Sequence, residues 1–123
     1  MDELVSRFAP EVEAAESVGG CVFTAWVHRG SPAVVRAIGE LDLAAAPRLV
    51  STLERLHGDV DVDCSGLEFI DAAGLAALVR AHRACAARGA RLAVVDPSPA
   101  VVRLLRLVRL DTVLHLRRSD EAS

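Results

Sequence analysis

The alternation of apolar and polar positions predicts that strands and helices follow one another from about residue 20 to residue 116. Alternating and apolar runs at 20–29 and 33–39 predict two strands, and the Gly-Ser-Pro turn between them favours an antiparallel hairpin. Apolar residues at helical spacing predict three helices, and shorter apolar runs predict three further strands. The helices are expected at 43–58, 72–89 and 98–110, and these strands at 59–70, 90–96 and 112–116.

Residues that suit helix N-caps precede the three predicted helices. Asp42, Asp71 and Ser98 each carry a short side chain whose oxygen can accept a hydrogen bond from an otherwise unpaired backbone N–H. Pro99 then falls at the first helical position, where its missing N–H matters least. In the first of these helices we expect Leu43 to begin the inner, apolar face.

The order of elements predicts an α/β fold. Strands that alternate with helices form βαβ crossovers, so we expect a small mixed, mostly parallel β-sheet with flanking helices and an antiparallel edge hairpin. The nearly continuous apolar run at 90–96 suits a parallel strand covered on both faces. We expect one domain at 20–118, an acidic N-terminal arm at 1–19 that is mobile or a short helix, and a polar tail at 119–123.

Composition and charge limit the possible functions. The chain has 123 residues, enough for one domain with its own core, and because aromatic residues make up only 3% the core must be aliphatic. No apolar run approaches the roughly 18 residues that span a bilayer, and the N-terminus lacks a signal pattern, so we expect a cytoplasmic protein without membrane insertion. The net charge of −3 argues against direct binding of nucleic acid.

The motifs of common enzymes and metal sites are missing from the sequence. There is no phosphate-binding loop, no nucleophile elbow and no dinucleotide-binding glycine pattern, so we expect neither an enzyme nor a cofactor. Asp59, Asp61 and Asp63 alternate along one side of a strand, but they lack the turn glycines of a calcium loop. We interpret them as a solvated strand face and expect no metal site.

The chain has three cysteines, Cys21, Cys64 and Cys85, and no two of them form a Cys-x-x-Cys motif. Cysteine often behaves as a small buried hydrophobic residue, and that is our first interpretation. A redox switch between two of the three is the alternative, and it depends on distances between sulfur atoms that the sequence does not give.

The segment FIDAAGLAALV, at 69–79, joins a predicted strand to a predicted helix. Asp71 fits the N-cap, but Gly74 in the first helical turn costs about 1 kcal/mol relative to alanine and needs an explanation. Ala72, Ala73 and Gly74 could form a bare floor that a partner approaches closely. Alternatively, Gly74 could allow tight packing against a neighbouring loop of the same chain.

Three segments together resemble the STAS domain, which bacterial anti-sigma factor antagonists share with the cytoplasmic domains of sulfate transporters. They are GELDLAAAPRL at 39–49, DVDCSGLEFIDAAGLAALV at 61–79 and GARLAVVDPSPAVVRLLRLVRLDTVL at 89–114. The resemblance covers about residues 20–118. It implies a small sheet of four or five strands flanked by helices, in agreement with the element order.

In the antagonists of this family, the junction typically reads Asp-Ser-Ser-Gly or Asp-Thr-Ser-Gly, and the residue before the glycine is phosphorylated. A partner anti-sigma factor with serine-kinase ATPase activity phosphorylates it, and only the unphosphorylated form binds that partner and frees the sigma factor. Here Asp71 and Gly74 match the family pattern, whereas the phosphoacceptor position falls on Ala73 and the position before it on Ala72. The resemblance therefore implies an antagonist that cannot be phosphorylated at this position.

The resemblance also implies a surface for the anti-sigma factor. The residues expected to face this partner are Asp42, Asp71, Ala72, Ala73, Gly74, Pro97, Ser98 and Pro99. Regulation would then come from the supply of partner, from another hydroxyl such as Ser65 or Ser98, or from the cysteines. Two alternatives stay open: a STAS subunit that braces the ATPase of a lipid-trafficking ABC transporter, which can also carry alanine before the glycine, and a STAS module of a larger signalling assembly.

Overall fold

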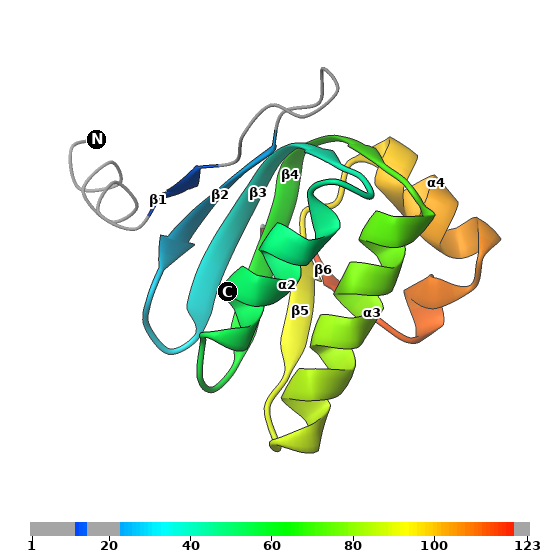
Figure 1. The fold of residues 1–123 in the computed structure, drawn as a ribbon. Coiled ribbons are helices and arrows are strands. Elements are labelled where there is room, and N and C mark those ends of the chain that lie inside the picture. The colour runs from blue at the N-terminus through cyan, green and yellow to red at the C-terminus, as the bar shows by residue number, and fades with distance from the viewer. Residues whose placement is uncertain (1–11, 15–22, 120–123) are drawn as a thin grey trace.

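The structure is a computed structural model that describes residues 12–14 and 23–119. Six strands form a single sheet in the order β1-β2-β3-β4-β5-β6, and helices connect the later strands (Figure 1). The strands are β1 (Val12–Ala14), β2 (Phe23–His28), β3 (Ala33–Leu41), β4 (Val60–Ile70), β5 (Leu92–Val95) and β6 (His115–Arg117). The helices are α2 (Ala46–Glu54), α3 (Ala72–Ala87), α4 (Pro99–Leu107) and the short 3-10 helix η2 (Leu110–Thr112).

The strand directions confirm the predicted α/β fold. β2 and β3 form the expected antiparallel hairpin, and β3, β4, β5 and β6 run parallel. β1 pairs antiparallel with β2 and forms the outer edge of the sheet. This strand lies inside the segment expected to be a mobile arm or a short helix, and its three residues are too few to show a strand pattern in the sequence. The rest of that segment lies outside the described residues, and so does Cys21 at the start of the predicted strand 20–29.

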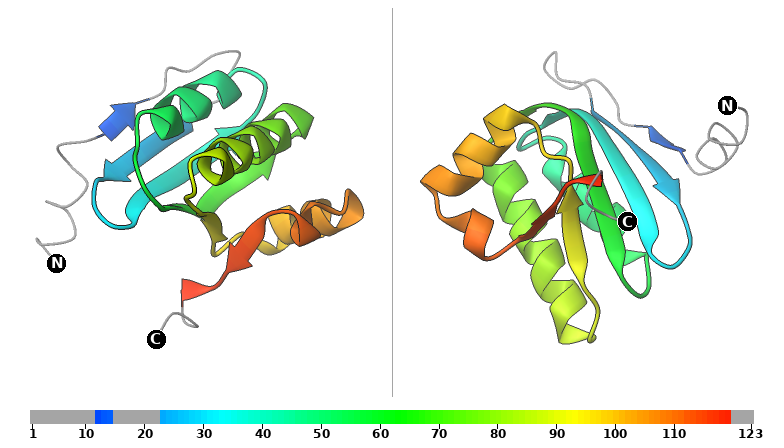
Figure 2. Two further views of the ribbon diagram at one scale, coloured as in Figure 1. Left: turned by 90° about the horizontal axis from the view of Figure 1, so that it is seen from below. Right: turned by 180° about the vertical axis from the view of Figure 1, so that it is seen from behind.

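The main core lies between the sheet and the helices that cover one of its faces. α2 and α3 lie side by side on this face (Figures 1 and 2). Val35, Val62, Leu49 and Leu78 are fully buried between the two layers. All four residues of β5 are buried, which confirms that this strand is covered on both faces. No helix in the described part of the chain has the length and apolar character needed to cross a membrane.

Several element boundaries differ from the prediction. The first predicted helix begins at Ala46 instead of residue 43, and the prediction of Asp42 as its N-cap is wrong, because the N-cap is Ala45. The Asp42 side chain instead accepts a hydrogen bond from Ala45 N at 3.0 Å and closes a separate turn before the helix. This helix also ends at Glu54, four residues before Gly58. The last strand begins at His115 instead of residue 112, because the preceding residues form η2.

The unequal lengths of the strands determine what lies near the junction. β3 continues to Leu41, which pairs with Ile70 at the end of β4. By contrast, Asp63 is the last residue of β4 that pairs with β5. The end of β4 therefore lies beside the β3–α2 connection, and well beyond the end of β5.

Candidate partner-binding site

Asp71 joins the start of α3 to the turn that precedes α2. Its Oδ1 atom accepts a hydrogen bond from Gly74 N at 2.9 Å, which confirms the predicted N-cap. Its Oδ2 atom accepts one from Leu43 N at 3.1 Å, and its own N–H donates to Leu41 O at 3.3 Å. One side chain therefore sets the position of two segments that are 28 residues apart in the sequence.

Gly74 is buried against the end of β3. A Cβ atom at this position would collide with the carbonyl oxygen of Leu41 and lie 2.8 Å from Ile70 Cγ1. Of the two explanations for this glycine, the structure supports tight packing against a neighbouring loop of the same chain. Gly74 thus lies beneath the junction surface, and its N–H is already used by Asp71.

The two alanines have different environments. Ala72 is exposed, whereas Ala73 is half-buried and packs against a small cluster formed by Ala46, Val50 and Ala77. A shallow hollow runs from this cluster between α2 and α3, and it is lined mostly by small side chains, together with Glu54 and Arg80. Ala73 therefore lies at one end of the groove between α2 and α3. Its methyl group occupies the position where the family pattern has a hydroxyl.

Two large apolar side chains near the junction are exposed, and their exposure was not predicted from the sequence. Leu43 is 74% exposed, although the helical spacing placed it on the inner face of the first helix. The reason is that Leu43 lies in the turn before α2, where its N–H is held by Asp71. Phe69 is 49% exposed and pairs with Glu40 near the end of β4. Exposed apolar groups beside a polar cap are typical of protein-binding surfaces.

The loop of Pro97, Ser98 and Pro99 lies in a different environment. Ser98 caps α4 as predicted, with Val101 N at 3.4 Å from its Oγ. The loop lines a hollow with Ser65, and among the described residues no hydrogen bond joins it to Asp71. The structure brings Asp42 and residues 71–74 together, and the role of this loop in partner binding stays a prediction.

The two hydroxyls considered as substitutes for the missing phosphoacceptor also differ. Ser65 is exposed and donates a hydrogen bond to Asp63 Oδ1 at 2.7 Å. Ser98 is half-buried, and its hydroxyl oxygen is occupied by the helix cap. Ser65 is therefore the more accessible of the two.

Cys64 and Cys85 are free thiols buried in the core. Burial, with a smaller contribution from the charge of Asp63, raises the pKa of Cys64 to about 12. The thiol therefore stays protonated, and protonated thiols react slowly with oxidants. This environment fits the interpretation as small buried hydrophobic residues for these two cysteines, while Cys21 lies outside the described residues.

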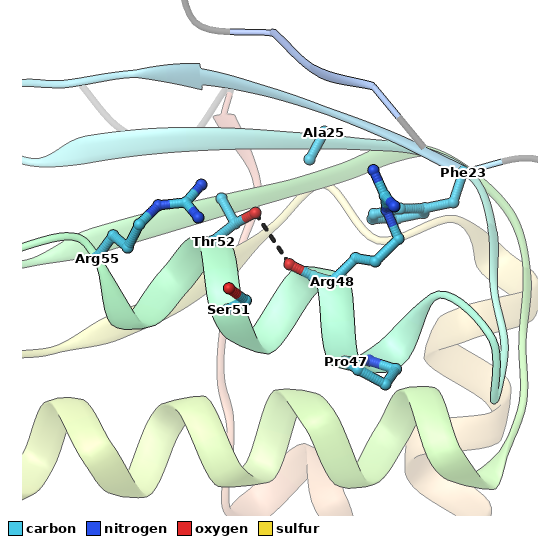
Figure 3. Close-up of a pocket in the computed structure, with 7 residues that line it drawn as sticks. All are labelled: Phe23, Ala25, Pro47, Arg48, Ser51, Thr52 and Arg55. Atoms are coloured by element: carbon cyan, nitrogen blue, oxygen red, sulfur yellow. Dashed lines mark hydrogen bonds between the residues drawn. The ribbon is translucent and has the colours of Figure 1, made fainter. Parts of the chain in front are cut away.

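A hollow between β2 and α2 combines apolar and basic side chains (Figure 3). Phe23 forms its wall on the sheet, Arg48 projects from α2, and Arg55 directly follows this helix. Both arginines already have interaction partners. Within residues 12–14 and 23–119, no group of three or more His, Cys, Asp or Glu side chains is placed to hold a metal ion.

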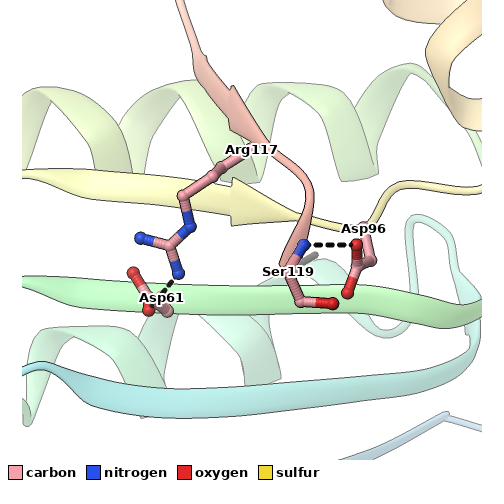
Figure 4. A network of polar contacts seen from close by, with 4 residues as sticks. All are labelled: Asp61, Asp96, Arg117 and Ser119. Carbon is pink, nitrogen blue, oxygen red and sulfur yellow. Dashed lines mark hydrogen bonds and ion pairs between the residues drawn. The ribbon is translucent and has the colours of Figure 1, made fainter. Parts of the chain in front are cut away.

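The end of β6 is held by a polar network (Figure 4). Arg117 reaches across β5 to Asp61, with 2.6 Å between Nη2 and Oδ2. Asp96 donates its N–H to Arg117 O at 2.8 Å, and its Oδ1 accepts a hydrogen bond from Ser119 N at 2.8 Å. Hydrogen bonds from the side chain and the backbone of Ser119 lower the pKa of the Asp96 carboxyl.

The chain was compared with known families and structures. A family model described as "Mlab, STAS domain" matches residues 24–117. An anti-sigma factor antagonist from Mycobacterium paratuberculosis is 25% identical, with 85% of this chain and 89% of that chain covered and a TM-score of 0.71. A search of curated proteins found no significant match.

Two further solved structures share the fold at lower identity. The anti-sigma factor antagonist SpoIIAA in its unphosphorylated form is 21% identical, with 82% of this chain and 92% of that chain covered and a TM-score of 0.66. The Bacillus cell fate determinant SpoIIAA in its phosphorylated form is 20% identical. The match covers 82% of this chain and 96% of that chain, with a TM-score of 0.62.

Proposed function

Because the chain belongs to the STAS domain family, we propose that it is an anti-sigma factor antagonist that binds a kinase-type anti-sigma factor and releases its sigma factor. The likeness to the mycobacterial antagonist, which covers most of both chains, supports this general function. The site residue that distinguishes this chain is Ala73, which offers the kinase no hydroxyl at the junction. The protein is then always in the form that binds, unless another group regulates it.

The observation that carries the proposal is the surface around the Asp71 cap. Ala72 is exposed, exposed Leu43 is tied to Asp71 through its N–H, and exposed Phe69 precedes Asp71 by two residues. The groove between α2 and α3 begins at Ala73. Small side chains let a partner backbone approach closely, and the two large apolar groups supply area whose burial stabilises the complex by about 25 cal/mol per Å². A phosphate in this surface would add a dianion that opposes binding, and alanine avoids it.

The proposed role needs no catalytic residue, cofactor or nucleic-acid contact from this chain. The partner supplies the ATPase chemistry, and the antagonist supplies only a complementary surface. Because sigma factors act on transcription, we place the protein in the cytoplasm.

The test is the release of the sigma factor. The full chain is added to a purified complex of the host's kinase-type anti-sigma factor and its sigma factor, and the products are separated by size. We expect free sigma factor and a new complex of this chain with the anti-sigma factor, and we expect Ala73→Glu to abolish both. Ala86→Glu, at an exposed position near the other end of α3, is the matched control and should behave as wild type. A sigma factor that stays bound to its anti-sigma factor would contradict the proposal.

A STAS subunit that braces the ATPase of a lipid-trafficking ABC transporter is the second candidate. The description of the matching family model names Mlab, and alanine before the junction glycine is compatible with such subunits. A pull-down from the native cell distinguishes the two candidates. The informative partner is the protein that binds the wild-type chain but does not bind the Ala73→Glu variant. A transporter ATPase would favour the second candidate, and a multidomain signalling complex would favour the third, a STAS module of a larger assembly.

A further inference from the structure

Two adjoining hollows lie beside α4, away from the junction surface. The first is lined by Ser65 on β4, by Ser98 at the start of α4, and by Arg106 and Arg118. The second shares these two arginines and adds Arg103 and Leu107. Pro97 and Pro99, from the loop predicted to face the partner, border both hollows, whereas the surface around Asp71 borders neither.

Positive charge is in excess here, because four arginines and one carboxylate line the two hollows. Among the described residues, Arg103, Arg106 and Arg118 have no ion pair or side-chain hydrogen bond. The neighbouring guanidinium of Arg117 is held by Asp61 at 2.6 Å (Figure 4). The carboxylate of Asp96 lines the first hollow, accepts a hydrogen bond from Ser119 N and offsets part of the positive charge of Arg118 and Arg117. Unpaired like charges repel one another, and a bound anion would relieve this repulsion.

The donors around the hollows suit a phosphate group. Guanidinium groups present paired N–H donors that match two phosphate oxygens at once, and Arg106 and Arg118 come from two different parts of the chain. The N-terminus of α4 adds partial positive charge, whereas the Ser65 hydroxyl at the rim already donates its proton to Asp63 Oδ1 at 2.7 Å. We propose that these hollows form a binding site for a phosphate group, with Arg106 and Arg118 as its principal ligands.

The phosphate has two possible sources with the same chemistry. It can belong to a free phosphate monoester, or it can be the headgroup of an anionic lipid. Leu107 lines the second hollow and is 74% exposed, so a lipid surface would bury this side chain and a small monoester would not need it. The contribution of Leu107 therefore separates the two sources.

The first experiment titrates the ¹⁵N-labelled full chain with inorganic phosphate at constant ionic strength. We expect saturable chemical-shift changes at Ser65, at the start of α4 and at Arg118. Arg106→Gln and Arg118→Gln should each raise the dissociation constant by about tenfold, the usual effect of losing a charge-assisted hydrogen bond. Arg83→Gln, an exposed arginine on α3, is the matched control and should change nothing.

The second experiment measures co-sedimentation with vesicles of phosphatidylcholine, with and without phosphatidylglycerol. Binding that requires the anionic lipid and is weakened by both Arg106→Gln and Leu107→Ser would support the site with a lipid source. Saturable binding of inorganic phosphate without vesicle binding would support the free source. Changes that do not saturate, or that persist in both the Arg106 and the Arg118 variants, would overturn the proposal. Because these residues lie apart from Asp71, that failure would leave the sigma-release test unaffected.

Discussion

The carboxylate of Asp71 accepts a hydrogen bond from Leu43 N at 3.1 Å, while its other oxygen caps α3. This single side chain holds an exposed apolar residue at a fixed place beside the bare start of a helix. The cap that stabilises the fold therefore also arranges the surface proposed to bind the anti-sigma factor.

Replacing Asp71 should affect both stability and binding. Asp71→Ala removes two acceptors and should lower the free energy of unfolding by about 1–2 kcal/mol, with a further loss of partner affinity because Leu43 is released. Asp71→Asn keeps one acceptor and should lie between this variant and wild type. Urea denaturation and calorimetry measure the two effects, and equal values for wild type and Asp71→Ala would contradict the bridging role.

Gly74→Ala should destabilise the protein, against the helix preference of alanine. The added methyl collides with the carbonyl of Leu41, and overpacking of this kind costs about 1–3 kcal/mol. The control is Ala72→Gly at the exposed helix start, which should cost about 1 kcal/mol or less. Urea denaturation distinguishes the two variants, and a Gly74→Ala protein more stable than wild type would show that the junction is more open than described.

Leu43→Ser should weaken partner binding about tenfold or more, with little change in stability, because the side chain is exposed in the free protein and the proposed interface would bury it. Leu107→Ser is a close control, since Leu107 is equally exposed at 74% but lies on α4. Calorimetric titration with the purified anti-sigma factor measures both. An equal loss in the two variants would place the interface elsewhere.

Ala73→Ser should restore the missing switch. With the cognate anti-sigma kinase and ATP, the variant should take up phosphate in the peptide 69–79 and lose affinity for the kinase. The wild-type chain should take up none, as measured by mass spectrometry. Phosphate on Ser65 or Ser98 of the wild type would instead show that another hydroxyl regulates the protein.

Stability should fall as the pH rises above about 9. The unfolded Cys64 thiol ionises near its ordinary pKa of 9.0, whereas the folded thiol stays protonated to about 12. The unfolded state then binds fewer protons, so the free energy of unfolding decreases with pH by at most about 1.4 kcal/mol per unit for this group. Denaturation between pH 8 and 10 checks this, and Cys64→Ala should have a smaller slope. An unchanged slope would show that other groups cause the decline.

Several features of the fold could be predicted from the sequence because their causes are local. Helical spacing predicted α3, the Asp71 and Ser98 side chains predicted the caps of α3 and α4, and the apolar run at 90–96 predicted the buried strand β5. Each of these signals depends on residues within a few positions of one another. The identity of Ala73, and hence the missing hydroxyl, is also a property of the sequence alone.

The tertiary structure decided the features that depend on distant residues. Leu43 is exposed because Asp42 closes a turn before α2 and Asp71 holds that turn from 28 residues away. Gly74 is required because β3 extends far enough to place Leu41 against it. Arg106 and Arg118 meet because β6 returns alongside β5. Local periodicity cannot encode such contacts, since they arise only when strand lengths and crossovers bring separate segments together.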